Sequence, residues 1–195
     1  MLFRSREAVD KLVREVIREI GYVATDEKER EEIGFTADMC QVDCRIHSQS
    51  PHISQGVDVG GAGDQGLMFG FACDETPTLM PLPIDLSHRL VAHHADLRKN
   101  GKLGWLRPDA KSQVTVEYNA DGTPNRIHTV VLSTQHNRSV MTTKNGQDYF
   151  TDDARQIVIE QLILPVLKAD RPDLIKGKLV MIPPGKEAQI GRAHV

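Results

Sequence analysis

The chain has 195 residues, 39% of them hydrophobic and 26% charged, with a net charge of −3 at pH 7. This composition is ordinary for a globular protein, and the small negative charge gives no electrostatic reason to expect a nucleic acid or a membrane as partner. There is no apolar run of membrane-spanning length, no signal-peptide pattern and no disulfide framework among 3 cysteines, so we expect a cytoplasmic protein.

The first predicted element is a helix. Apolar residues recur at helical spacing from Arg6 to Ile20, and Gly21 follows as a stop signal. We expect the charged segment from Ala24 to Glu32 to be a connection. The end segments 1–5 and 190–195 resemble the translation of a sequencing adapter, so we expect them to be non-native tips of a piece of a longer protein.

A half-buried strand is predicted from Cys40 to His47, where apolar and polar residues alternate. The spacing of Cys40, Cys44 and His47 raises the alternative of a zinc site. On a strand, however, the two cysteines face one side and His47 faces the other. The pattern therefore favours buried thiols over a metal centre.

The polar stretch from His47 to Gly66 ends in a glycine-rich segment, Gly60 to Gly66. Long loops inside a compact domain are often functional, and glycines allow a ligand to approach the backbone closely. Gly61, Gly63 and Gly66 also match the dinucleotide-binding fingerprint, which requires a strand before it and a helix after it. Here a polar segment precedes, and the apolar, strand-like run from Leu67 to Ala72 follows, so the fingerprint is not supported.

Ser87 is predicted to cap a helix that runs to Lys99, with Asn100-Gly101 ending it. The helix contains His88, His93 and His94, which do not form a zinc motif and are expected on its solvated face. A second polar loop is expected from Asn100 to Ser112.

Further along, a β-hairpin is predicted from Val114–Tyr118 and Ile127–Thr134, turned by Asn119 to Gly122. Residues 137–149 are expected to be exposed. Thr151 is predicted to cap a helix, and residues 178–182 to form a final strand. Helices alternating with hairpins indicate an α+β fold with antiparallel or mixed sheets packed against helices.

Segments in this order resemble one enzyme family: Gln49–Asp58, Gly61–Phe71, Trp105–Thr115 and Ser133–His136. Together they are similar to methionine adenosyltransferase, also called S-adenosylmethionine synthetase, and Gly-Ala-Gly-Asp-Gln-Gly at 61–66 is among its most specific motifs. The resemblance implies an α+β enzyme with a pseudo-threefold domain repeat. It further implies a homodimer or homotetramer with active sites between subunits.

The implied reaction makes S-adenosylmethionine from ATP and methionine, and then cleaves the released tripolyphosphate to phosphate and diphosphate with Mg²⁺ and K⁺. A thioether sulfur has no proton to lose, so its attack on the ribose C5′ needs no general base. The chemistry instead requires cations for the leaving phosphates and a carboxylate for the ammonium and sulfonium.

Particular residues take roles by this resemblance. Lys111 matches a catalytic lysine at the phosphates, Asp109 and Ala110 belong to the ATP site, and Lys186 is a weaker ATP-site match. Asp64 corresponds to a catalytic acid near methionine. Gln49 corresponds to a methionine-contacting glutamine at the start of a gating loop.

The resemblance also has departures. Val59-Gly60 alone separates Asp58 from Gly61, so the gating loop is shortened, and the family's N-terminal His/Asp motif and later Lys motif are absent, which leaves the metal ligands outside the chain. We therefore expect a partial N-terminal domain at 6–58, a central domain at 61–189 and no catalytic activity of the chain alone. The alternative is a non-catalytic nucleotide- or polyphosphate-binding module, or a divergent regulatory paralogue.

Overall fold

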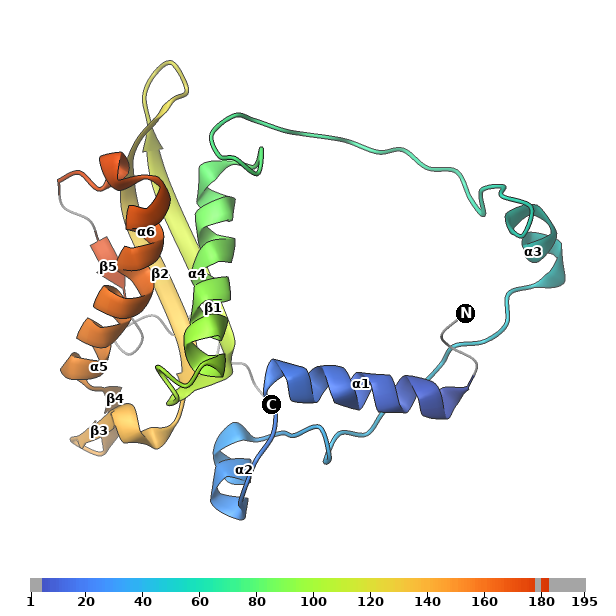
Figure 1. Ribbon diagram of the computed structural model, residues 1–195, viewed down its shortest axis with the longest axis horizontal. Helices are drawn as coiled ribbons and strands as arrows, with labels where there is room; N and C mark the ends of the chain where they lie inside the picture. Colours follow the sequence, from blue (N-terminus) through green and yellow to red (C-terminus); the bar gives the residue numbers. More distant parts are fainter. Residues whose placement is uncertain (1–4, 178–179, 183–195) are drawn as a thin grey trace.

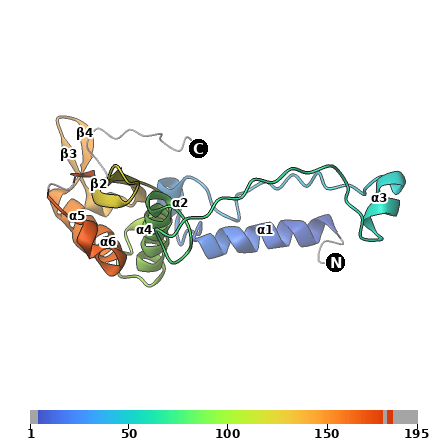
Figure 2. The same cartoon turned by 90° about the horizontal axis from the view of Figure 1, so that it is seen from above.

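The computed structural model describes residues 5–177 and 180–182. Figure 1 shows a body of helices and strands, from which the segment before α4 (Leu82–Lys99) leaves as an extended arm that carries α3 (Pro51–Val57). In Figure 2, the view from above, α3 again lies at one end of the molecule and the sheet with its helices lies at the other. The arm and the body are therefore described separately.

The sheet of the body is built on a long hairpin. β1 (Leu106–Tyr118) pairs antiparallel with β2 (Pro124–His136), and β5 (Val180–Ile182) pairs with β2 in parallel, which gives the order β1-β2-β5. The turn is closed by the Gly122 amide, which donates to the Asn119 carbonyl at 3.0 Å. The predicted hairpin is confirmed, although β1 starts earlier and includes more than half of the predicted loop from Asn100 to Ser112. The predicted final strand is confirmed at 180–182, and its first two residues, 178 and 179, lie outside the described residues.

Two helical rods cover one face of this sheet (Figures 1 and 2). One is α4, and the other runs from α5 (Asp152–Ile157) through the π-helical segment η2 (Val158–Ile163) into α6 (Leu164–Asp170). Thr151 caps α5 as predicted. Buried core side chains come from the rods and the sheet: Leu86, Leu90, Ile127, Leu132, Leu162 and Leu167. Burying each contributes roughly 1.5–3 kcal/mol, so the rods hold the sheet mainly by apolar packing. The structure is α+β, as predicted.

The start of α4 differs from the prediction. The helix begins at Leu82 rather than after Ser87, whose hydroxyl lies inside the helix and donates to the Pro83 carbonyl at 2.7 Å. The cap is supplied from outside the helix: one carboxylate oxygen of Glu75 accepts from the Leu82 amide at 2.8 Å and from the Tyr118 hydroxyl at 2.9 Å. Burial and this carboxylate raise the pKa of Tyr118 to about 12.

The prediction that the α4 histidines are solvated is correct only for His88. His94 is 1% exposed, and its Nε2 lies 2.6 Å from Thr134 Oγ1 on β2. His93 is half-buried against the η2 segment. A helix that packs between a sheet and another helix buries more than one stripe, so position on a polar-looking face did not predict exposure.

Two helices precede the arm. α1 (Arg6–Ile20) ends at Gly21, as predicted, with a φ of 111° that favours glycine. The predicted connection from Ala24 to Glu32 contains a helix instead, α2 (Glu27–Ile33), capped by Asp26. In Figure 1, α2 lies below the lower end of the sheet, and α1 points away from the body with its C-terminal end toward the sheet.

The arm, residues 41–72, contains neither predicted strand. Residues 40–47 and 67–72 are extended, but no described segment pairs with them. The alternation of apolar and polar residues indicates which face a segment can bury. A strand also requires a neighbouring segment whose backbone forms hydrogen bonds with it. The apolar side chains of 67–71 are consequently exposed, with Phe69 at 92%. Within the predicted loop 47–66, Ser50 caps the short helix α3.

A small hairpin lies at the end of the sheet nearest α2 (Figure 1). After η1 (Arg138–Val140), β3 (Met141–Lys144) and β4 (Gln147–Phe150) form a two-stranded hairpin in the segment that was expected to be exposed and polar. Phe150 anchors this hairpin in the core at 2% exposure. A 3-10 turn, η3 (Pro172–Leu174), follows α6.

Candidate functional site

The site with the most chemical character lies at the start of β1, where the strand bulges. Leu106 is opposite His136 and Ala110 is opposite Thr134, so three residues, 107–109, face Gln135 alone. A bulge of this kind bends a strand and redirects its side chains. Beyond it, Ser112 faces α4 and bonds to the Ser87 carbonyl, while Lys111 is exposed. The structure thus groups Asp109, Ala110 and Lys111 on one bulged strand end, rather than on the loop predicted there.

Asp109 is half-buried beside the segment that follows α1. Burial raises the pKa of the Tyr22 phenol, and the Asp109 carboxylate raises it further. The Tyr22 ring packs against Phe35, with centroids 5.0 Å apart. Arg98 of α4 lies in the same place: it donates to the Ile20 carbonyl at 2.6 Å, and burial lowers the pKa of its guanidinium.

Arg107, the first residue of the bulge, is held by α2. Its Nη1 donates to Glu29 Oε1 at 2.7 Å, and its Nη2 lies 3.9 Å from Glu32. The other carboxylate oxygen of Glu29 accepts from the amide and hydroxyl of Thr25 at 2.9 and 2.8 Å. These bonds, those to Thr25 first, lower the pKa of Glu29 to about 2, so the carboxylate is charged at neutral pH.

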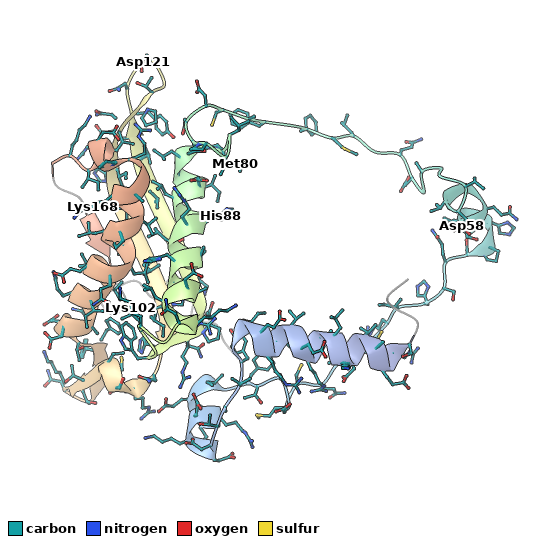
Figure 3. All side chains as sticks on the ribbon, viewed as in Figure 1. Asp58, Met80, His88, Lys102, Asp121 and Lys168 are labelled. Carbon is teal, nitrogen blue, oxygen red and sulfur yellow. The ribbon has the colours of Figure 1, made fainter. Side chains whose placement is uncertain are left out.

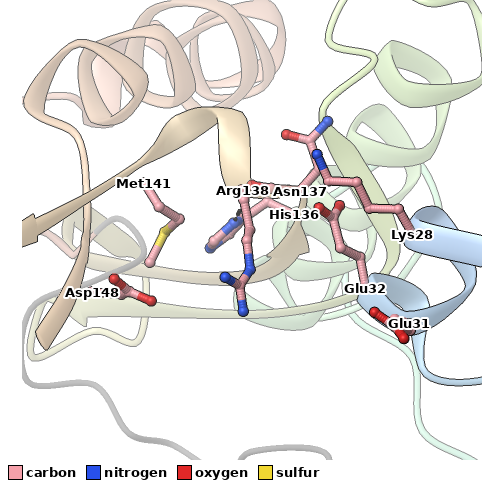
Figure 4. Close-up of a pocket in the computed structure, with 8 residues that line it drawn as sticks. All are labelled: Lys28, Glu31, Glu32, His136, Asn137, Arg138, Met141 and Asp148. Carbon is pink, nitrogen blue, oxygen red and sulfur yellow. Dashed lines mark hydrogen bonds between the residues drawn. The ribbon is translucent and has the colours of Figure 1, made fainter.

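Two adjoining cavities of about 480 Å³ each lie along α2, and Figure 4 shows the residues that line one of them. Both are lined by Lys28, Glu32, Asn137 and Arg138, so they form one cleft between α2 and the η1 region. Figure 4 shows Arg138 reaching into it between Asp148 and Glu32. Burial lowers the pKa of His136, which packs against Phe150 in the wall. The cleft carries both signs of charge, and none of the predicted site residues that the structure describes lines it.

The predicted methionine-site residues lie elsewhere. Gln49 and Asp64 are exposed on the arm, on either side of α3, and Figures 1 and 3 show this part of the arm far from β1. Asp64 bonds only locally, accepting from the Gln65 amide at 2.7 Å. The chain therefore does not bring Gln49 and Asp64 to Asp109 and Lys111. Lys186 lies outside the described residues.

The glycine-rich segment has a structural use at Gly61. Its amide donates to the Gly56 carbonyl at 2.9 Å, and a Cβ at this position would collide with that carbonyl. A helix, α3, precedes the segment and an extended chain follows it, which is the reverse of the dinucleotide-binding arrangement.

Two other kinds of site are absent from the part of the chain that the structure describes. It contains no group of three His, Cys, Asp or Glu side chains placed to hold a metal ion. Within the same residues, no helix combines the length and the apolar character needed to cross a bilayer.

Sequence reasoning missed the network around the bulge. Glu29 and Arg107 are 78 residues apart, and nothing local links them. One signal was present in the sequence: Asp26 and Glu29 have the spacing of a capping box, which predicts a helix start there.

A comparison with protein families places these observations in context. The sequence model of the S-adenosylmethionine synthetase central domain matches residues 59–186, more than half of the chain. The match includes the glycine-rich segment, α4, the β1–β2 hairpin and the bulge.

Proposed function

The chain belongs to the S-adenosylmethionine synthetase family, and we propose that it contributes the Asp109–Lys111 segment to a site where ATP and methionine form S-adenosylmethionine. The parent protein would be a methionine adenosyltransferase, and a cytoplasmic location is part of the same proposal. The observation that carries the proposal is the bulged start of β1, inside the matched range, which presents an exposed lysine two residues after a half-buried aspartate.

The proposed roles follow from charge. The sulfur of methionine attacks C5′ of ATP and forms a C–S bond as the C–O bond to tripolyphosphate breaks, so negative charge collects on the leaving oxygen. The ammonium of Lys111 stabilises that charge, as a fixed cation does for transferring phosphoryl groups. Asp109 and Ala110 would position the nucleotide, and Lys186 is a further proposed contact with it. No proton-accepting residue is required, because the thioether has none to give.

Methionine binding is assigned to the arm. Asp64 would attract the positive charge of the substrate ammonium and the product sulfonium, and Gln49 would bond its polar groups. The part of the arm around α3, which carries Gln49 and Asp64, lies far from β1, which carries Lys111 (Figure 1). The proposal therefore includes assembly into a homodimer or homotetramer that completes the site. The exposed apolar run 67–71 supports such an assembly, since large exposed apolar patches mark contact surfaces.

Family members of this kind use Mg²⁺ and K⁺. Hard cations take several oxygen ligands. The described residues contain no group of three or more His, Cys, Asp or Glu side chains that could hold a metal ion, so neither ion is assigned a ligand among them.

The test is binding and turnover in the whole chain. Titration with inorganic tripolyphosphate should give heat that is strongly reduced by Lys111→Ala and unchanged by Lys144→Ala, an exposed lysine on β3. Formation of S-adenosylmethionine from ATP and methionine is measured in parallel. Equal binding by both variants would refute the role of Lys111.

A second function remains open because Gln49 and Asp64 are remote from Lys111. In that case the chain is a non-catalytic nucleotide- or polyphosphate-binding module or a regulatory paralogue. Tripolyphosphate binding without any S-adenosylmethionine formation, also after supplying a full-length relative as partner, would favour it. Turnover that requires Lys111 would favour the enzyme.

A further inference from the structure

We propose that Glu29 is a positioning residue for the Asp109–Lys111 segment: its contact with Arg107 fixes the β1 bulge, and so the placement of Asp109 and Lys111. The inference rests on the proposed function for its ligand and on the geometry of the bulge for its mechanism. Glu29 itself is assigned no contact with substrate.

All three bulge residues are packed by the segment that ends α1 and forms α2. Arg107 is bound to Glu29 at 2.7 Å, and Pro108 packs against the position where Gly21 lacks a side chain. Asp109 is close enough to Tyr22 to raise the pKa of its phenol. Gln135, the residue opposite the bulge, donates to the Ile33 carbonyl at 3.4 Å. The bulge is therefore shaped by residues 21–33 as well as by its own strand.

Glu29 is held by several contacts at once. Its amide bonds to the capping residue Asp26 at 2.8 Å, and one carboxylate oxygen is taken by Thr25. The remaining oxygen therefore faces Arg107 with a fixed direction. Side chains held by second contacts place their partners more accurately than free ones. The side chains of Arg107 and Glu29 are 15% and 24% exposed, so water screens this pair only partly.

Glu32, the other acid that pairs with Arg107 among the described residues, lies farther away, with its carboxylate 3.9 Å from Nη2. Its Nε is buried and has no hydrogen-bond partner among the described residues. Without the Glu29 carboxylate, the Arg107 guanidinium loses its shortest hydrogen bond and turns toward water. The backbone of residues 107–109 then relaxes. The spacing between Asp109 and Lys111 then changes.

The experiment compares Glu29→Gln with Glu27→Gln. Both variants remove one negative charge from α2, but Glu27 is exposed and its ion pair is with Arg30 of the same helix rather than with the bulge. Tripolyphosphate is an anion, so removing a negative charge alone should strengthen its binding slightly. We expect Glu29→Gln to weaken tripolyphosphate binding about tenfold, which is the opposite of the electrostatic effect. Glu27→Gln should leave the binding unchanged or slightly stronger.

A double-mutant cycle identifies the route. If Glu29 acts through Arg107, the loss caused by Glu29→Gln should disappear in an Arg107→Gln background. Equal binding by wild type and Glu29→Gln, or losses that simply add, would overturn the inference.

Hydrogen exchange tests the same inference without ligand. The amides of 107–111 should exchange about tenfold faster in Glu29→Gln, while those of 114–116 on the same strand keep their rates. Unchanged exchange at 107–111 would overturn the inference. Failure of the wild-type chain to bind tripolyphosphate would instead refute the proposed function, and the exchange result would still decide the role of Glu29.

Discussion

The Nε2 atom of His93 lies 3.1 Å from the carbonyl oxygen of Gln161, and this contact joins α4 to the π-helical segment of the second rod. In a regular α-helix, the amide of residue 165 would donate to that carbonyl, but residue 165 is proline and has no amide hydrogen. His93 therefore supplies, from another helix, a hydrogen bond that Pro165 cannot make. The contact also indicates that the Nε2 of His93 carries the proton.

Replacing His93 should therefore remove one hydrogen bond from the half-buried carbonyl of Gln161. We expect His93→Ala to lower the free energy of unfolding by about 1–3 kcal/mol. His88→Ala on the exposed face of the same helix is the control and should change it by less than about 0.5 kcal/mol. Urea unfolding measures both, and equal effects would show that the His93 contact is not stabilising.

The buried His94 predicts a dependence of stability on pH. Burial is the main cause that lowers its pKa from 6.5 to about 4. Between these two pKa values, His94 is protonated in the unfolded chain but not in the folded chain. The contribution of His94 to the free energy of unfolding is therefore fully present above pH 6.5 and is lost as the pH falls to about 4, by up to roughly 3 kcal/mol.

The measurement is urea unfolding at pH 7 and pH 4.5. Burial also lowers the pKa of His136, which contributes in the same direction, so the informative quantity is the difference between wild type and His94→Gln. In His94→Gln, the free energy of unfolding should depend much less on pH, because glutamine does not titrate. Its side-chain amide can still bond to Thr134, so the hydrogen bond is kept. An unaltered pH profile would contradict the assignment.

Gly21 offers a test of close packing. Its φ of 111° is unfavourable for other residues, and a Cβ there would collide with the Arg98 guanidinium. Gly34 also has a positive φ, 80°, but nothing lies within 4 Å of the Cβ position. Gly34→Ala should cost about 1–2 kcal/mol from backbone strain alone. Gly21→Ala should cost more, and the excess, measured by thermal or urea unfolding, reports the displacement of Arg98.

Two phenylalanines should behave in opposite ways. Phe150 is 2% exposed and packs with Trp105 and His136, so Phe150→Ala should lower the free energy of unfolding by about 3–5 kcal/mol.

Phe69 is 92% exposed on the arm, so Phe69→Ser should leave the melting temperature unchanged but reduce self-association in light scattering. Self-association that does not change would argue against the arm as an assembly surface.

Sequence predicted best where the signal was local. The helix from Arg6 to Gly21, the cap at Thr151 and the turn at 119–122 each depend on a few neighbouring residues, and all are present. The prediction of two strands in the arm was wrong because a strand needs a second segment to pair with. The burial of His94 and the pairing of Glu29 with Arg107 depend on contacts 40 and 78 residues away, which no local pattern records.

The way α1 and α2 attach to the body also affects what happens if the arm is cut. Arg45 is an exposed basic residue on that arm, as a trypsin-like protease requires. After cleavage there, nothing covalent would join the first part of the chain to the rest. The bonds from Arg98 to Ile20, from Arg107 to Glu29 and from Gln135 to Ile33 would remain. The two pieces would then form a complex whose survival depends on dilution, so the first 45 residues act as a ligand that happens to be tethered to its receptor.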